Sequence, residues 1–211
     1  MSNTSAARSL VNSSTRDLNE TQTAMAAVRR MVNLYLYISR RTSSRGFDYD
    51  IMSNFQLVHA SGHSATETHR ASLHPTVTWR LVVKPHHTNL NNVLHGGCYG
   101  VIFDMATMSA MTPVQKEGYW DFMAGVTRTL NISFLKAVPV GTTILVNSRV
   151  VQHGRTMCLI AGELVSEDGL TVYATCEHHK VHVPMLEQHI RFRDEMARNE
   201  ARDVVEGRAR L

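Results

Sequence analysis

The stretch from Gly97 to Met111 constrains this chain more than any other. Nearly every position in it is apolar or small, and Asp104 is its one ionisable side chain. A helix with no polar face is expected inside a fold, with other elements covering it on all sides. The polar, Asn-rich segment that begins at Asn89 predicts a loop leading into this helix, whose expected extent is about residues 96–112. A carboxylate inside such a helix is costly unless it is paired or functional.

Length and charge narrow the class of protein. The 211 residues suit one domain with tails, and 43% hydrophobic residues suffice for a core. No apolar run approaches the roughly 18 residues that span a bilayer, so no integral membrane segment is expected. The net charge of +4 comes without an aromatic and basic recognition motif, which argues against nucleic acid. A polyanionic small ligand such as a CoA ester fits the same positive charge.

Cysteine and histidine usage argues against metals and disulfides. The three cysteines have no CxxC spacing, and their odd number favours free thiols in a reducing compartment. His178 and His179 are adjacent in a predicted strand, so they point to opposite faces and do not suit a shared zinc ion. Neither a metal nor a cofactor is therefore expected.

The two ends of the chain lie outside the predicted domain of residues 47–184. In the N-terminal extension, residues 1–46, apolar residues recur at helical spacing from Leu18 to Arg41 beside several arginines, which predicts an amphipathic basic helix. We expect it to pack on the domain or a sister subunit, with weak membrane-surface contact as the alternative. Residues 1–17 are expected to be disordered. Residues 185–211 mix acids and arginines and predict a solvated helical tail.

The composition of the N-terminus bears on localisation. Residues 1–16 contain Ser, Thr, Asn and Arg but no acid, which faintly resembles a mitochondrial presequence, although Asp17 and Glu20 soon interrupt that pattern. The expected compartment is therefore the cytoplasm or, alternatively, the mitochondrion.

The central domain is rich in strand-like alternation. A short helix at 50–54 precedes the strands, whose expected ranges are 56–59, 76–83, 125–137, 142–152, 156–166 and 170–183. The last four are joined by short turns, which predicts antiparallel neighbours in chain order. A curved antiparallel sheet wrapped around one long helix would bury that helix. This α+β arrangement is the hotdog fold.

Several motifs resemble one family. Asn89, the His95-Gly96-Gly97 run, Asp104, Gly125-Val126-Thr127 and the segment 131–137 are similar in order and spacing to the hotdog-fold acyl-CoA thioesterases of the phenylacetyl-CoA thioesterase and thioesterase superfamily member 2 type. The resemblance covers about residues 47–183. It implies a hydrolase that splits an acyl-CoA into acid and free CoA. It also implies a homodimer, commonly paired into a tetramer, with active sites at the subunit interface.

The resemblance also assigns roles to single residues. Asp104 matches the family's general base or nucleophile, Gly96 the backbone N–H that polarises the thioester carbonyl, and Asn89 an assisting amide. Further site residues implied are His95, which is structural or contacts substrate, Thr127 where the family has serine, and His178 near a family histidine. The substrate and CoA contacts implied are Gly97, Lys136, Ala137, His153, Gly154, Arg155, Thr156 and His178, with CoA present only as part of the substrate.

The chemistry of a thioester suits these residues. A thiol with a pKa of about 8.5 leaves readily, so the enzyme must chiefly stabilise an oxyanion and deliver water. The start of a helix offers unpaired N–H groups and partial positive charge, and glycine lets the carbonyl approach closely. Three alternatives remain open: a hotdog hydratase or dehydratase, an inactive acyl-CoA-binding or partner-docking protein, and a carrier-protein thioester as substrate in place of CoA.

Overall fold

The computed structural model describes residues 3–42, 45–62, 74–116, 118–121 and 125–205. The predicted helix and strands are present within a residue or a few of the expected bounds. The elements in chain order are α1 (Asn3–Arg41), α2 (Tyr49–Asn54), β1 (Gln56–Ser61), β2 (Thr76–Val82), η1 (Pro85–His87), α3 (Gly96–Ser109), η2 (Thr112–Val114), β3 (Val126–Phe134), β4 (Thr143–His153), β5 (Met157–Ser166), β6 (Val172–Val181) and α4 (Glu187–Val205).

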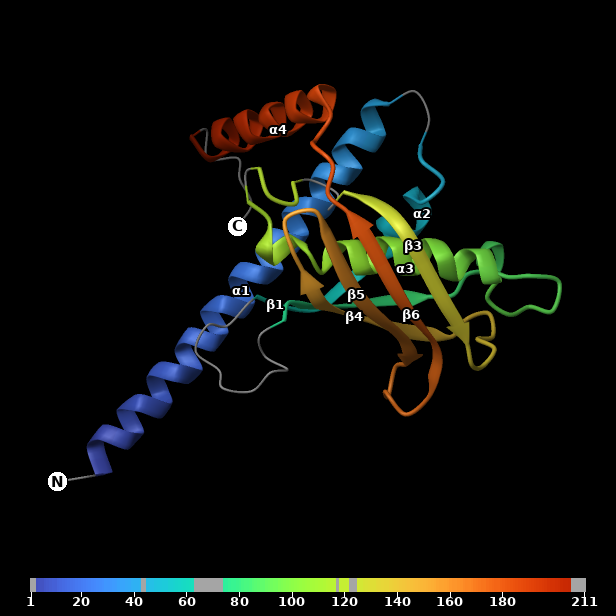
Figure 1. Cartoon of the computed structure of the whole chain (residues 1–211), viewed down its shortest axis with the longest axis horizontal. Helices are drawn as coiled ribbons and strands as arrows, with labels where there is room; N and C mark the ends of the chain where they lie inside the picture. Colours follow the sequence, from blue (N-terminus) through green and yellow to red (C-terminus); the bar gives the residue numbers. More distant parts are fainter. Residues whose placement is uncertain (1–2, 43–44, 63–73, 117, 122–124, 206–211) are drawn as a thin grey trace.

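One antiparallel sheet curves around the central helix α3 (Figure 1). Its six strands have the order β1-β2-β4-β5-β6-β3. Alternate residues of each inner strand face the helix and are buried, as for Ile144, Val146 and Val150 of β4. The predicted hotdog fold is confirmed. No described helix is long and apolar enough to cross a membrane.

The predicted pairing of β3 with β4 is wrong. β3 lies at the far edge of the sheet and pairs with β6, whereas β4 pairs with β2 and β5. Eight residues, 135–142, connect β3 to β4 and pass the start of α3, where Leu94 N–H donates to Val138 O at 2.8 Å. Three strand spacings amount to about 14 Å, and eight residues reach about 26 Å, so a short connection can cross two strands here.

The prediction that α3 is buried on all sides is also wrong. Gly97, Gly100, Val101 and Asp104, spaced three and four residues apart, form one stripe that is not buried. The sheet covers the other faces, where Ile102, for example, is fully buried. We call this stripe the open face of α3.

The N-terminal helix is longer than the sequence predicts. Residues 1–17 were expected to lack structure, yet α1 begins at Asn3, and only residues 1–2 lie outside the described part of this segment. A helix that is already anchored can extend at little cost per residue, because the costly step is nucleation. The predicted amphipathic portion is confirmed, since Val28 and Met31 are buried and α1 packs on β1.

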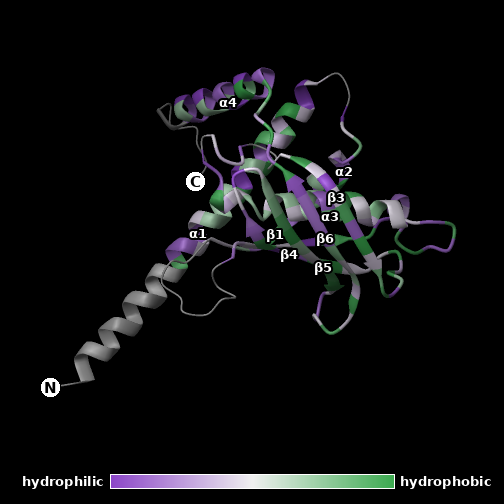
Figure 2. Ribbon diagram, in the orientation of Figure 1, coloured by the Kyte–Doolittle hydropathy of each residue, from purple (hydrophilic) through white to green (hydrophobic). Residues whose placement is uncertain are grey.

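Helix α4 packs on α1 rather than standing free in solvent. Met196 of α4 is buried with Leu34 and Ile38 of α1, and Arg41 forms an ion pair with Glu195 at 2.7 Å. Most of α4 is nevertheless hydrophilic (Figure 2), as the mixed charges of the tail predict. The last six residues, 206–211, lie outside the described part of the chain.

Candidate active site

A polar cluster surrounds Asp104 on the open face of α3. Thr127 on β3 donates its hydroxyl hydrogen to Asp104 Oδ1 at 3.0 Å. His178 Nε2 lies 2.9 Å from the same hydroxyl and 3.6 Å from Asp104 Oδ1. The Asp104 side chain is 41% exposed, so the carboxylate is both held by neighbours and open to a reactant. The structure therefore brings Asp104, Thr127 and His178 together.

The neighbours of His178 determine which of its ring nitrogens carries the hydrogen. Its Nδ1 lies 2.6 Å from the hydroxyl of Thr107, and the ring is fully buried. Burial, followed by the nearby positive charge of Lys180, lowers the pKa of His178 to about 4, so the ring is neutral near pH 7. Because Thr127 commits its hydrogen to Asp104, Nε2 is the donor to that hydroxyl and carries the ring hydrogen. The Thr107 hydroxyl also lies 2.5 Å from Phe103 O, so its single hydrogen serves either that carbonyl or Nδ1.

Lys180 completes the cluster, and the sequence analysis missed it. Its Nζ lies 3.6 Å from Asp104 Oδ1 and 3.5 Å from Thr127 Oγ1, and its side chain is only 3% exposed. Burial lowers the pKa of Lys180, and the Asp104 carboxylate opposes that shift. The sequence could have indicated Lys180, because residues 178 and 180 of one strand point to the same face and His178 was already a predicted site residue. Thr107 was missed as well, although it lies one helical turn beyond Asp104.

An irregularity in β3 presents Thr127 to the helix. The pairing of β3 with β6 shifts register between Thr127 and Thr129, which places Thr127 opposite Lys180. Bulges of this kind re-aim side chains and occur often beside active sites. Gly125 immediately precedes the strand with φ +73°, and a Cβ there would clash with the carbonyl oxygen of Val181. Only glycine allows β3 to approach β6 this closely.

The other end of α3 offers backbone groups instead of charged side chains. His95 precedes the helix, and its Nδ1 accepts the N–H of Gly97 at 2.9 Å, so His95 serves as the N-cap. The N–H of Cys98 donates to His95 O. Within the described part of the chain, the N–H of Gly96 has no hydrogen-bond partner, and Gly96 is exposed. This donor is available to an acceptor at the positive end of the helix.

Asn89 holds the loop that precedes this helix. Its Oδ1 accepts the N–H of Asn91 at 2.9 Å, and its backbone N–H donates to Val93 O at 2.9 Å. An isolated β-bridge between Thr88 and Leu94 closes the loop. The side-chain oxygen of Asn89 is thus used within the loop, and its amide N–H₂ is the group that remains for a substrate.

A cavity of about 320 Å³ lies next to Gly96. The wall opposite Gly96 comes from the end of β3 and the residues after it, and its lining is Leu94, Gly96, Tyr99, Phe134, Leu135, Lys136 and Ala137. Lys136 and Ala137 are exposed. Three of the predicted substrate and CoA contacts, Gly97, Lys136 and Ala137, therefore lie at the Gly96 end of the helix.

The predicted CoA contacts at residues 153–156 lie near the end of β6 that holds Lys180. His153 ends β4, and Gly154, Arg155 and Thr156 form the turn before β5. Thr156 O accepts the N–H of His182, which follows β6 two residues after Lys180. His153 Nδ1 lies 2.7 Å from the hydroxyl of Tyr119, and Gly154 O accepts Trp120 Nε1–H at 2.7 Å. Arg155 and Thr156 are exposed.

The predicted site is thus divided into two groups within one chain. Gly96 and Asp104 are eight residues apart on the same helix, which corresponds to about 12 Å at a rise of about 1.5 Å per residue. A single thioester cannot contact both residues of one chain. The first group holds Gly96, His95, Asn89, Lys136 and Ala137, and the second holds Asp104, Thr127, His178, Lys180 and the 153–156 turn.

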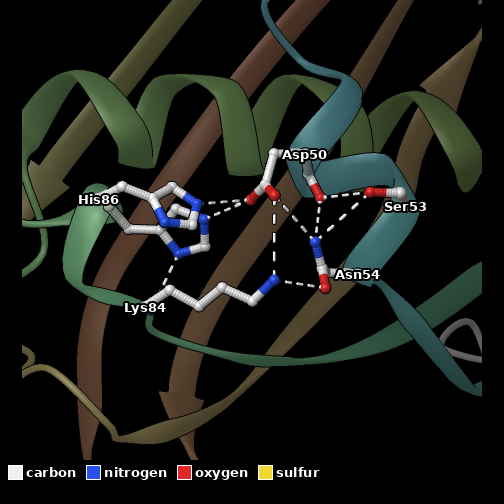
Figure 3. A network of polar contacts seen from close by, with 6 residues as sticks. Asp50, Ser53, Asn54, Lys84 and His86 are labelled. Atoms are coloured by element: carbon white, nitrogen blue, oxygen red, sulfur yellow. Dashed lines mark hydrogen bonds and ion pairs between the residues drawn. The ribbon is translucent and has the colours of Figure 1, made fainter.

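A second polar cluster joins α2 to η1 (Figure 3). His86 Nε2 and His87 Nε2 lie 3.0 and 2.7 Å from Asp50 Oδ2. Burial opposes ionisation of Asp50, but the hydrogen bonds from the two histidines outweigh it and lower the pKa of this carboxyl. The three groups lie close enough together to hold a metal ion.

The hydrogen bonds of this cluster disfavour a metal. The backbone N–H of Lys84 donates to His87 Nδ1 at 3.1 Å, so the ring hydrogen is at Nε2 and donates to Asp50. A metal at Nε2 would have to displace that hydrogen. The ammonium of Lys84, 3.9 Å from Asp50 Oδ1, already supplies positive charge. His95 N–H donates to His87 O at 2.9 Å, so the cluster supports the loop that leads to Gly96.

Comparisons with known proteins agree with this fold. Residues 91–173 match the model of the Thioesterase superfamily. Zebrafish thioesterase superfamily member 2 is 24% identical, with a TM-score of 0.55, over 71% of this chain and 96% of that chain. The Mus musculus member 2 is 18% identical, with a TM-score of 0.53, over 72% and 96%. The E. coli PaaI protein from the phenylacetic acid degradation operon is 15% identical, with a TM-score of 0.47, over 62% and 80%.

A comparison with curated proteins found no match. The resemblance predicted from the His95-Gly96-Gly97 run and Asp104 is confirmed, since both motifs lie inside the matching segment. The likeness to the two member 2 structures shows the fold. The chain thus matches the Thioesterase superfamily model at residues 91–173 and has a hotdog fold like that of thioesterase superfamily member 2.

Proposed function

We propose that this protein is an acyl-CoA thioesterase whose active site is shared between two copies of the chain. The observation that carries the proposal is found on α3, which bears an unpartnered N–H at its start and a hydrogen-bonded, half-exposed carboxylate on its open face. The first suits an oxyanion and the second suits an attacking water.

The reaction follows from the two groups. The N–H of Gly96 binds the thioester carbonyl oxygen, which gains negative charge as water adds to the carbonyl carbon. Asp104 removes a proton from that water, and Thr127 holds the carboxylate in place. The tetrahedral intermediate collapses, the carbon–sulfur bond breaks, and CoA leaves as a thiolate that takes up a proton. The products are the free acid and CoA.

A second subunit brings the two groups together. Because Gly96 and Asp104 of one chain are about 12 Å apart, the two groups that meet at one thioester come from different chains. The open face of α3 and the free edge of β3 are the surfaces that a partner would cover. Val126, Phe134 and Leu135 are exposed along that edge. We propose a homodimer, or a dimer of such dimers.

The CoA moiety would then contact both chains. Lys136 lies beside the cavity at Gly96, and Arg155 lies on the turn near Lys180 of the other group. Both side chains are exposed cations, as phosphate ligands need to be. Single replacements, Lys136→Ala and Arg155→Ala, are expected to raise KM for acyl-CoA more than they lower kcat.

A thiol-release assay with a panel of acyl-CoAs tests the function. We expect hydrolysis of at least one acyl class, with little remaining in Asp104→Asn. An acyl-carrier-protein thioester belongs in the same panel, because its preference over CoA would change the substrate class. If the wild-type protein binds acyl-CoA and hydrolyses nothing, it is a binding protein and the proposal is wrong.

Isotope labelling separates the two roles open to Asp104. A single turnover in H₂¹⁸O with excess enzyme places ¹⁸O in the acid if Asp104 activates water. If Asp104 attacks the carbonyl itself, water attack on the aspartyl carbonyl of the resulting anhydride leaves ¹⁸O in the protein. Mass spectrometry of the product and of the peptide containing Asp104 distinguishes the two.

A further inference from the structure

Lys180 is a buried cation with weak pairing. Its side chain is 3% exposed, and removing an ammonium from water costs several kcal/mol in a protein interior. Its contacts, 3.6 Å to Asp104 Oδ1 and 3.5 Å to Thr127 Oγ1, are longer than the roughly 2.8 Å of a tight charge-assisted hydrogen bond. Such a pair recovers only part of that cost, so stability does not account for Lys180.

The groups around Lys180 come from every neighbouring element. Asp104 faces it from α3, Thr127 from β3 and Cys158 from β5, while His178 lies two residues away on the same face of β6. Burial raises the pKa of the Cys158 thiol to about 11, so this group is neutral near pH 7. Asp104 is therefore the negative charge that Lys180 meets.

We propose that Lys180 is a positioning residue, whose ammonium fixes the carboxylate of Asp104 and the hydroxyl of Thr127. This inference rests on the thioesterase activity proposed above and extends it. A neutral His178 donates from Nε2 to Thr127, which in turn donates to Asp104, while Nδ1 lies 2.6 Å from the Thr107 hydroxyl. The carboxylate then faces the reactant in one orientation.

The geometry explains why the charge matters. His178 Nε2 and Lys180 Nζ are both 3.6 Å from the same oxygen of Asp104. A second proton on His178 would place another positive charge beside the carboxylate oxygen that the ammonium already contacts, and the two like charges would repel. Without Lys180, the Asp104 carboxylate would raise the pKa of His178 against the lowering effect of burial. The carboxylate would also lose one of the groups that fix its orientation.

Activity and stability should change in opposite directions in Lys180→Met. Methionine fills a similar volume without a charge, and Asp104 can be hydrated through its exposed side. We expect a melting temperature equal to or above that of wild type, a kcat about tenfold to a hundredfold lower, and little change in KM. Lys116→Met, at an exposed lysine, is the matched control and should change neither. A lysine with only a structural role would lose stability and activity together.

A second readout does not depend on hydrolysis. The titration of His178, followed by NMR and identified by the resonance missing in His178→Asn, should have a pKa of about 4 in the wild-type protein and a clearly higher pKa in Lys180→Met. Lys180→Arg keeps the charge and should keep the low pKa. Wild-type kcat in Lys180→Met, or a His178 pKa that stays at about 4, would overturn the inference. An inactive wild-type protein would instead refute the proposed function, and the NMR titration would still decide the role of Lys180.

Discussion

The start and the middle of α3 contribute different kinds of chemical group to the proposed site. At its start, the useful group is a backbone N–H on an exposed glycine, and the nearby His95 side chain serves as a cap. Near its middle, the useful groups are side chains: the buried His178 and Lys180 and the more exposed Asp104 and Thr127. A side chain can be deleted by substitution, whereas a backbone donor can only be obstructed. The two ends should therefore respond differently to mutation.

The largest loss of activity is expected from substitution of the Asp104 side chain. Asp104→Asn keeps the size of the residue but removes the base, and general-base catalysis contributes about a hundredfold to ten-thousandfold. We expect kcat to fall within that range at saturating acyl-CoA. Asp203→Asn, at an exposed carboxylate on α4, is the control. Full activity in Asp104→Asn would show that Asp104 is not the base of the reaction.

The backbone end should be sensitive to crowding. In Gly96→Ala, the added Cβ would lie 3.8 Å from the Phe134 ring, an ordinary contact, so the fold should hold. The methyl group obstructs the approach of a carbonyl oxygen to the N–H, and loss of one oxyanion donor costs about a hundredfold or more. Steady-state kinetics together with a melting curve measure both effects. Gly62→Ala, with no atom within 4 Å of the new Cβ, is the control.

The buried ring of His178 should make stability depend on pH. Its folded pKa of about 4 lies below the ordinary value of about 6.5, so between these values the unfolded chain binds the extra proton. Stability therefore rises with pH across this window and is lost as pH falls from about 6.5 to about 4, by about 3 kcal/mol in total. Urea unfolding at pH 7 and pH 5 measures the slope. A slope in His178→Asn as steep as in wild type would contradict this assignment.

The smallest expected effect concerns the support of the Gly96 loop. Asp50→Asn weakens the contacts to His86 and His87 and leaves the buried His87 less well satisfied, at a cost of about 1–2 kcal/mol. Because His87 O accepts the N–H of His95, kcat should fall by severalfold as well. Glu167→Gln, which weakens a more exposed ion pair with Arg80, should cost less than about 1 kcal/mol and leave kcat unchanged. An unchanged kcat in Asp50→Asn would show that this cluster contributes to stability but not to catalysis.

Local patterns predicted the elements well. The apolar run after Gly97 located α3, and the alternation along β4 located a strand with one buried face. Neither pattern states which strands are neighbours, and for that reason β3 was assigned to β4 instead of β6. Burial on the open face of α3 was overestimated because the sequence shows that a helix must be covered but not whether its own chain or a second copy does so.

The candidate site was predicted in part. Asp104 was an anomaly in an apolar helix, and His178 was implied by the resemblance, but Lys180 was assigned no role. Only the pairing of β6 with β3 shows that its side chain points toward Asp104. The unpartnered N–H of Gly96 also requires the structure, because whether a backbone donor is satisfied depends on the cap that His95 makes and on the course of the loop.

The most direct test asks whether one active site needs two chains. Gly96→Ala damages one group and Asp104→Asn the other, so each homodimer should be nearly inactive. A mixed dimer should contain one site with both defects and one intact site. Co-expression of the two variants in equal amounts should therefore restore about a quarter of wild-type kcat. A mixture no more active than the average of the two variants would place Gly96 and Asp104 of one chain in the same site and contradict the shared active site.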